Sequence, residues 1–211
     1  MKIENAEIYG FGASLKGMRN PLDSWDRSDS YLDAHIDIKN SNWNIEGFTL
    51  GEADKKLSQK LTKAGSEHSK HLRLITVWFD ITAPRFWYQE FDTYKHKENV
   101  SCSTMHILMK KPINETYFEQ DNIPASLIDK INTYIDLYKQ TTDREEKNAY
   151  LLACKNILPE GFLQKRTVCT NYQTLYTIYC RRKNHKLPQW HVFCDWIKGL
   201  PYFIELTGLE D

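Results

Sequence analysis

The chain has 211 residues, of which 41% are hydrophobic, enough for one sizeable core, so we expect a single domain over residues 1–211 with a helical elaboration at about 124–157. Lys and Arg (28) balance Asp and Glu (28), and a chain without net charge lacks the field that draws proteins onto nucleic acid or acidic membranes. No segment has the length and apolarity of a membrane span or a signal peptide. The five cysteines are scattered without a CxxC pair, which is typical of a reduced, cytoplasmic protein. We therefore expect no nucleic acid polymer and no membrane among its partners.

The first half of the chain predicts two strands and three helices. Residues 2–11 alternate well enough for an opening strand, and the turn and cap residues of 20–33 indicate loops around a short helix. The spacing of leucines over 51–65 predicts a helix that ends at a glycine. β-Branched and aromatic residues over 72–81 predict a buried strand, and a proline then precedes a short aromatic helix over 85–94.

The second half predicts four helices. Residues 126–140 are amphipathic, and 143–159 begin with acidic residues and end at a proline. Two further helices are expected over 171–185 and 188–200. The expected apolar face of the helix over 126–140 is formed by Leu127, Ile131, Ile135 and Tyr138. A few strands with clustered helices indicate an α+β fold.

Two blocks of sequence carry a resemblance to a known family. "HSKHLRLITVWFDITAPRFWYQEF" (68–91) and "ILPEGFLQKRTVCTNYQTLYTIYCRRKNHKLPQW" (157–190) resemble the flavin-dependent thymidylate synthases in order and spacing. The resemblance extends to uncharacterised phage proteins of this general type. It implies an α+β fold with a small, mainly antiparallel sheet, and a homotetramer whose subunits share sites for FAD and a pyrimidine nucleotide. Folate and NADPH are implied only where catalysis is retained.

The family's signature loop falls on residues 93–106. It reads Arg-His-Arg, two residues, Ser, one, Asn-Glu, one, Ser, one, Arg-Tyr. Here Thr93, Tyr94 and Lys95 stand at Arg-His-Arg, and Ser103 is the one identical residue. The final Arg-Tyr is replaced by Met105 and His106. The lost arginines would bind phosphate in a bidentate manner, which lysine replaces only as a point charge.

Other family positions are better matched, and the resemblance assigns their roles. His68 and Asn171 fall on residues near the flavin, and Lys165 and Arg182 fall on arginines that hold the nucleotide. Arg166 adds a neighbouring cation. The candidate residues are therefore Ser103 and His106 for catalysis, His68, Tyr94, Lys95 and Asn171 for the cofactor, and Lys165, Arg166 and Arg182 for the nucleotide; no metal ligand is assigned.

Each of these assignments has a simpler alternative. The basic residues at 165–166 and 181–183 also suit a solvated helix face. Tyr172, Tyr176 and Tyr179 recur at helical spacing and suit a core or a subunit interface as well as a stacked base. Cys102 is a weak candidate nucleophile. Zinc ligation by Cys180, His185, His191 and Cys194 has irregular spacing, and "GFGAS" at 10–14 lacks the other glycines of a phosphate loop.

Three functions are consistent with the sequence. The first is a flavin-dependent thymidylate-synthase-like enzyme that transfers a one-carbon unit to C5 of a pyrimidine nucleotide, with Ser103 positioning the base. The second is a non-catalytic protein on the same scaffold that sequesters or senses a modified or signalling nucleotide, as a phage counter-defence factor would. The third is a structural protein that shares only the fold.

Overall fold

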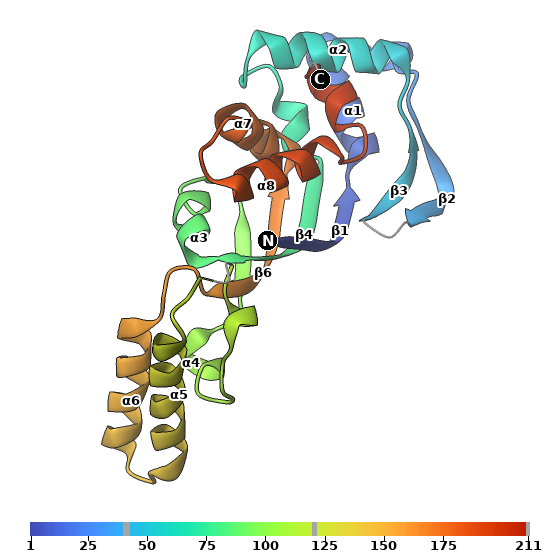
Figure 1. Cartoon of the computed structure of the whole chain (residues 1–211). Helices are drawn as coiled ribbons and strands as arrows, with labels where there is room; N and C mark the ends of the chain where they lie inside the picture. The colour runs from blue at the N-terminus through green and yellow to red at the C-terminus, as the bar shows by residue number, and fades with distance from the viewer. Residues whose placement is uncertain (40–42, 120–121, 210–211) are drawn as a thin grey trace. The chain divides into compact units, whose positions relative to one another are not determined.

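The structure is a computed structural model that describes residues 1–39, 43–119 and 122–209, apart from the side chains of 34–39 and 43–46. Figure 1 labels its helices and strands. Its strands are β1 (Lys2–Tyr9), β2 (Tyr31–Lys39), β3 (Trp43–Thr49), β4 (Thr76–Pro84), β5 (Glu98–Ser101) and β6 (Leu163–Asn171). Its α-helices are α1 (Phe11–Arg19), α2 (Glu52–Ala64), α3 (Arg85–Phe91), α4 (Thr104–Ile107), α5 (Ala125–Gln140), α6 (Arg144–Ile157), α7 (Tyr172–Arg182), α8 (Pro188–Lys198) and α9 (Phe203–Thr207). Short 3-10 turns are η1 (Asn20–Leu22), η2 (Trp25–Arg27), η3 (Lys70–Arg73) and η4 (Glu115–Tyr117).

The six strands form one sheet in the order β2-β3-β1-β4-β6-β5. β2 and β3 are antiparallel neighbours, with Ile38 opposite Ile45, while β1 pairs with β3 in parallel through Ala6 and Trp43. The small sheet and the clustered helices confirm the predicted α+β class.

Most of the predicted elements are confirmed within a few residues. The predicted strand at 2–11 is β1, and the helices expected over 51–65, 126–140, 143–159, 171–185 and 188–200 are α2, α5, α6, α7 and α8.

Three of the predicted segments differ in the structure. The buried strand begins at Thr76 rather than Leu72 because residues 70–73 form the turn η3. The aromatic helix ends at Phe91. Residues 20–33 form two 3-10 turns and the start of β2.

The chain divides into two compact units. Unit 1 comprises Met1–Lys2, Thr82–Thr93 and Val100–Arg166, and unit 2 comprises Ile3–Ile81, Tyr94–Asn99 and Thr167–Asp211. The single domain over residues 1–211 stays a prediction.

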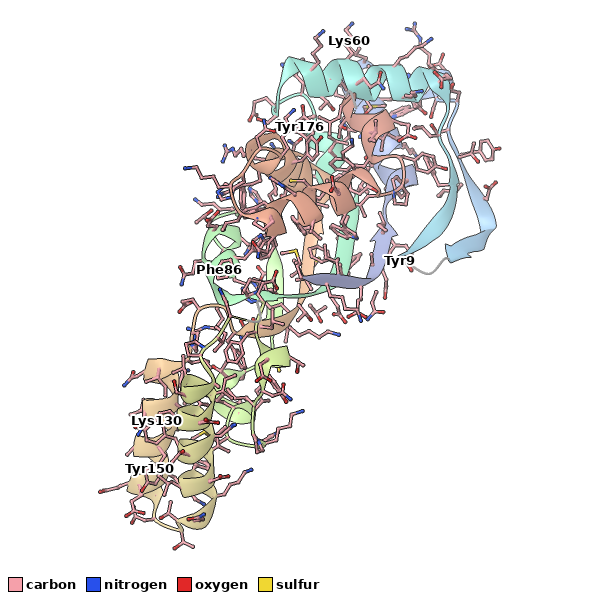
Figure 2. The ribbon with its side chains drawn as sticks, in the orientation of Figure 1. Tyr9, Lys60, Phe86, Lys130, Tyr150 and Tyr176 are labelled. Atoms are coloured by element: carbon pink, nitrogen blue, oxygen red, sulfur yellow. The ribbon has the colours of Figure 1, made fainter. Side chains whose placement is uncertain are left out.

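Unit 1 is built around the helix pair α5 and α6, which lie side by side (Figure 1). Ile128, Ile131 and Ile135 are buried, and Leu127 and Tyr138 pack against this core partly buried, so the predicted apolar face is confirmed and also includes Ile128. Asp143 begins α6 by accepting a hydrogen bond from the Glu146 backbone N–H at 2.9 Å, which satisfies an otherwise unpaired donor. The pair also carries an aromatic contact at the margin of this core, in which Tyr150 (Figure 2) stacks on Tyr134.

In unit 2 the sheet has a buried face and a more open one. On β4, Val77, Phe79 and Ile81 are buried, whereas Trp78 between them is 38% exposed. Phe79 packs against Phe193 and Trp196 of α8, with ring centroids 5.9 and 4.6 Å apart. Because buried and exposed side chains alternate along β4, α8 packs on the buried face of the sheet.

Helix α1 begins the aromatic core of unit 2. Its first residue, Phe11, stacks on Phe48 at 5.3 Å and meets Tyr172 edge-on at 5.7 Å. Tyr172 is fully buried and donates its hydroxyl to the Pro201 carbonyl at 2.5 Å. Of the three tyrosines that the sequence left between core and ligand, Tyr172 therefore belongs to the core.

One buried ion pair joins α1 to α2. Arg19 Nε donates to Asp54 Oδ1 at 2.6 Å, and both side chains are almost inaccessible to solvent. Asp54 Oδ2 accepts from the Ser28 hydroxyl and the Ser30 backbone N–H, so both oxygens of the buried carboxylate are satisfied.

Among the described residues, no helix has the length and apolarity needed to cross a membrane.

Candidate functional site

The segment that corresponds to the signature loop is divided between the two units. Residues 94–99 belong to unit 2, and residues 100–106 belong to unit 1, where they form the end of β5 and the single turn α4. His96 has a φ of 61°, a left-handed conformation that non-glycine residues adopt rarely and usually at functional or tightly constrained positions. Its carbonyl accepts a hydrogen bond from Thr170 Oγ1 at 3.1 Å, which ties the loop to β6.

A groove of about 450 Å³ in unit 2 brings this loop together with Asn171. His96, Lys97 and Glu98 line it from the loop side, and Arg73 lines it as well. Asn171 is the N-cap of α7, and its side chain accepts from the Thr174 backbone N–H at 2.9 Å. The groove therefore carries more cationic than anionic side chains, which favours an anionic ligand. We name it the Asn171 groove.

Cys169 also lines the Asn171 groove. Burial, followed by the nearby Glu98 carboxylate, raises the pKa of its thiol. The thiol therefore stays protonated at neutral pH, so Cys169 is a poor nucleophile.

A second cavity in unit 2, of about 380 Å³, is lined by His68. His68 is exposed at its rim, and Lys70 and His71 line it from η3, while α1 and η1 contribute apolar residues such as Met18 and Leu22. We name it the His68 cavity. The turn η3 links the two sites, because His71 lines this cavity and Arg73 lines the Asn171 groove.

His71 is held neutral by its surroundings. Ser58 Oγ donates to the Leu206 carbonyl at 2.7 Å, so the contact of 2.8 Å between Ser58 Oγ and His71 Nε2 requires the proton to be on Nε2. Nδ1 is then a buried acceptor with no hydrogen-bond partner among the described residues. Burial lowers the pKa of His71 from 6.5 to about 4.

Arg182 lies in a compact aromatic setting in unit 2. Its Nε donates to the Tyr94 hydroxyl at 2.7 Å, and its guanidinium carbon lies 4.7 Å from the centroid of the Trp190 ring. Trp190 is fully buried and contacts Tyr94 edge-on at 6.2 Å. Tyr94 and Arg182, predicted for cofactor and nucleotide, therefore meet directly. Such contacts hold a guanidinium in one orientation.

Arg166 is engaged within unit 1. Its Nη1 donates to both carboxylate oxygens of Asp92, at 2.9 and 3.0 Å, and its guanidinium lies 3.7 Å from the centroid of the Tyr88 ring. Nε and Nη2 each reach Gln164 Oε1 at 3.3 Å. Tyr88 in turn donates its hydroxyl to the Gln164 carbonyl at 2.9 Å. These contacts identify Arg166 as a local clamp, and its role toward a nucleotide stays a prediction.

We expect Arg166→Lys to lower the free energy of unfolding by about 1 kcal/mol, because lysine keeps the charge and loses the stacked, bidentate geometry. The value is modest because Asp92 is 44% exposed and solvent screens the pair. Denaturant unfolding of this variant beside Lys165→Arg would test this. If Arg166→Lys lowered the free energy of unfolding no more than Lys165→Arg does, the stabilising role of the Arg166 contacts would be contradicted.

The two predicted catalytic residues lie at either end of α4 in unit 1. Ser103 precedes the turn and is half-buried, and its carbonyl accepts the His106 backbone N–H at 3.1 Å. The imidazole of His106 is exposed, and no hydrogen bond joins the two side chains in the described part of the chain. Their catalytic roles stay predictions.

Lys165 and Cys102 meet through their backbones. The Cys102 N–H donates to the Lys165 carbonyl at 2.8 Å, and Gln164 Nε2 donates to the Cys102 carbonyl at 2.7 Å. The side chains of Lys165 and Lys95 are exposed. Lys165 belongs to unit 1 and Lys95 to unit 2, and the ligand roles of both stay predictions.

Over the parts of the chain that the structure describes, no three histidine, cysteine or acidic side chains gather as a metal site would require. In the segment considered for zinc, His191 Nε2 instead lies 2.7 Å from the His185 carbonyl.

Sequence reasoning missed two residues of these sites, Arg73 and His71. Both fall inside the first block of resemblance, in a segment that the sequence assigns partly to a strand. Their signal was the density of histidine and basic residues over 68–73, which suits a turn at the edge of a site better than a buried strand.

Comparison with known proteins identifies the fold. No family model matches the sequence, and no curated protein matches it significantly. Among solved structures, the chain is similar to the flavin-dependent thymidylate synthase ThyX of Helicobacter pylori complexed with FAD and dUMP. One such structure has a TM-score of 0.70 at 17% identity, covering 98% of this chain and 97% of that one. A second, at 2.31 Å resolution, has a TM-score of 0.69 at 16% identity with the same coverage.

The chain therefore has the fold of the flavin-dependent thymidylate synthases, as its two blocks of sequence predicted. At this identity the similarity establishes the fold alone.

Proposed function

We propose that this chain is a thymidylate-synthase-like protein that binds FAD and a pyrimidine nucleotide. The observation that carries the proposal is the pairing, within unit 2, of the His68 cavity with the Asn171 groove across η3. Both contain residues that the family resemblance assigns to the flavin. The related H. pylori enzyme was solved with FAD and dUMP.

The residues of unit 2 fit a dinucleotide cofactor. The Asn171 groove offers Arg73, His96 and Lys97 to a phosphate or another anionic group. The His68 cavity has apolar walls suited to a ring system, and its lining residue His71 carries a buried acceptor. Under this proposal His68 and Asn171 hold the cofactor, with Tyr94 and Lys95 from the loop beside them. FAD, when bound and reduced, would supply the hydride for the reaction.

The reaction proposed is methylation at C5 of a uracil-type base. The C5–H bond breaks and a C5–CH3 bond forms, with the carbon drawn from a methylene folate, two electrons from reduced flavin, and NADPH restoring the flavin. In this proposal Ser103 orients the base, His106 accepts or returns a proton, and Lys165, Arg166 and Arg182 bind the phosphate. The subunits would form a homotetramer with shared sites.

A second function is favoured by a specific observation. Tyr94 stands where the family has histidine, and its hydroxyl accepts a hydrogen bond from Arg182 Nε. With the signature arginines replaced as well, this chain would keep nucleotide binding and lose the geometry for catalysis. It would then sequester or sense a nucleotide.

One experiment distinguishes the two proposed functions. Purified protein is incubated with FAD, NADPH, methylene folate and dUMP carrying tritium at C5, and release of tritium to water is followed. Release above that of a Ser103→Ala variant supports the enzyme. Absence of release from protein that binds dUMP in calorimetry supports the binding protein, and absence of both overturns the proposed function.

We expect Arg182→Ala to weaken dUMP binding about 10- to 100-fold, because a charge-assisted contact to phosphate contributes about 1.5–3 kcal/mol. Calorimetric titration would measure it. Arg181→Ala is the matched control, since Arg181 is the exposed neighbour on α7. Equal affinities in the two variants would show that Arg182 only braces Tyr94 and Trp190.

A further inference from the structure

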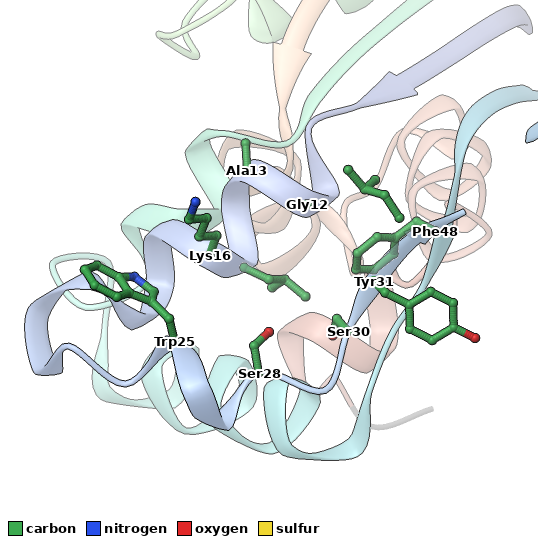
Figure 3. A pocket seen from close by; sticks show the side chains of 10 residues that line it. Gly12, Ala13, Lys16, Trp25, Ser28, Ser30, Tyr31 and Phe48 are labelled. Carbon is green, nitrogen blue, oxygen red and sulfur yellow. The ribbon is translucent and has the colours of Figure 1, made fainter. Parts of the chain in front are cut away.

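A third cavity in unit 2, of about 440 Å³, lies between α1, η2 and the outer ends of β2 and β3 (Figure 3). None of its lining residues lines the His68 cavity or the Asn171 groove. Its volume is within the usual range for small-molecule sites. The proposed flavin and nucleotide chemistry makes no use of it. We name it the Lys16 cavity.

Most of this cavity is apolar. Leu15 and Phe48, 1% and 2% exposed, form its interior, whereas Trp25, Tyr31 and Leu32 are each about half exposed at its rim. In Figure 3 the rings of Trp25 and Phe48 lie on opposite sides of the space. Two aromatic rings and a leucine left in solvent around one hollow are typical of a surface that a ligand covers.

The polar groups of the cavity favour an anion. The Lys16 ammonium forms no ion pair with any described residue, and no acidic side chain of the described chain lines the cavity. Ser30 Oγ accepts from the Gly51 N–H at 2.9 Å, so its own hydroxyl hydrogen remains to be donated. The nearby Asp54 is already neutralised by Arg19 at 2.6 Å. A ligand therefore meets donors and one uncompensated positive charge.

We propose that the Lys16 cavity binds a small amphipathic carboxylate. Its aromatic or aliphatic body lies against Leu15 and Phe48, and its carboxylate lies at the rim of the cavity, toward the Lys16 ammonium. The apolar walls supply most of the affinity, and the lysine supplies the preference for an acid over a neutral analogue.

The test uses 1-naphthylacetate and its neutral analogue 1-naphthylacetamide at low ionic strength. Binding is followed by the NMR shift of the Trp25 indole N–H, which donates to Asn20 Oδ1 and is assigned with a Trp25→Phe variant. We expect the acid to bind up to about fivefold more tightly than the amide, as an exposed ion pair allows. Lys16→Gln should abolish this preference, and the control Lys60→Gln should keep it, since Lys60 points outward from α2 (Figure 2).

A second variant tests the apolar part. Ala13 is exposed on α1 and lines the cavity, so Ala13→Phe should leave the fold intact and weaken both probes at least tenfold by filling the space. Thermal melts confirm that this variant is folded. Equal binding of acid and amide to the wild type, a preference that survives Lys16→Gln, or undiminished binding to Ala13→Phe would each overturn the proposal.

Discussion

Replacing Asp54 with alanine is expected to lower the free energy of unfolding by about 3–5 kcal/mol. The variant leaves the Arg19 guanidinium, 4% exposed, without its carboxylate partner in an interior that solvent does not reach. An unpaired buried charge costs far more than the ion pair itself contributes. The Ser28 hydroxyl and the Ser30 N–H lose their acceptor as well, which adds to the effect.

Urea unfolding monitored by circular dichroism would measure this change. Asp26→Ala is the matched control, because Asp26 is exposed in the same N-terminal region, and we expect a change within about 0.5 kcal/mol. A loss below about 1 kcal/mol in Asp54→Ala would show that the pair does not hold α1 to α2.

Stability is also expected to fall as the pH drops from about 6.5 to about 4. Burial lowers the pKa of His71 from 6.5 to about 4, so in this window the unfolded chain binds a proton that the folded chain does not. The stabilisation from neutral His71 is therefore complete above pH 6.5 and is lost as the pH falls through the folded-state value. The shift corresponds to up to about 3 kcal/mol.

The measurement is the free energy of unfolding at several pH values between 4 and 7. His71→Gln should be less stable at pH 7 and should lose less on acidification, whereas His68→Gln should retain the wild-type profile. The same pH dependence in His71→Gln as in the wild type would assign the effect to other groups.

The helices were the most predictable part of the fold. In α5 and α6 the period of the apolar residues and the flanking Asp143 and Pro159 are local signals, and they predicted both helices closely. Helix α1 was not predicted, because Gly12 and Gly17 reduce its intrinsic propensity and its stability comes from burying Phe11 and Leu15.

The strands depended more on distant partners. After its first residue, Leu163, β6 has a polar run over residues 164–167, and its buried residues, Val168 and Thr170, are too few to show a hydrophobic period. β3 pairs with both β2 and β1, so β2 and β3 are stabilised by strand pairing, and their own residues alone do not predict them as strands.

Candidate site residues were predicted where a family position kept its residue. His68 and Asn171 were predicted in this way and each lines a cavity of unit 2, while their roles toward a flavin stay predictions. The hydrogen-bond partners of the candidate arginines were not predictable. Arg166 meets Asp92 across 74 residues of sequence and Arg182 meets Tyr94 across 88, and no local pattern encodes such pairs.

Uptake of FAD by the purified protein tests the proposed function most directly. The protein is reconstituted with excess FAD, freed of unbound flavin by gel filtration, and examined for flavin absorbance in the protein peak. We predict a yellow protein with bound flavin approaching one per chain and reduced uptake in Asn171→Ala. A folded protein that stays colourless and takes up no FAD would contradict the proposal.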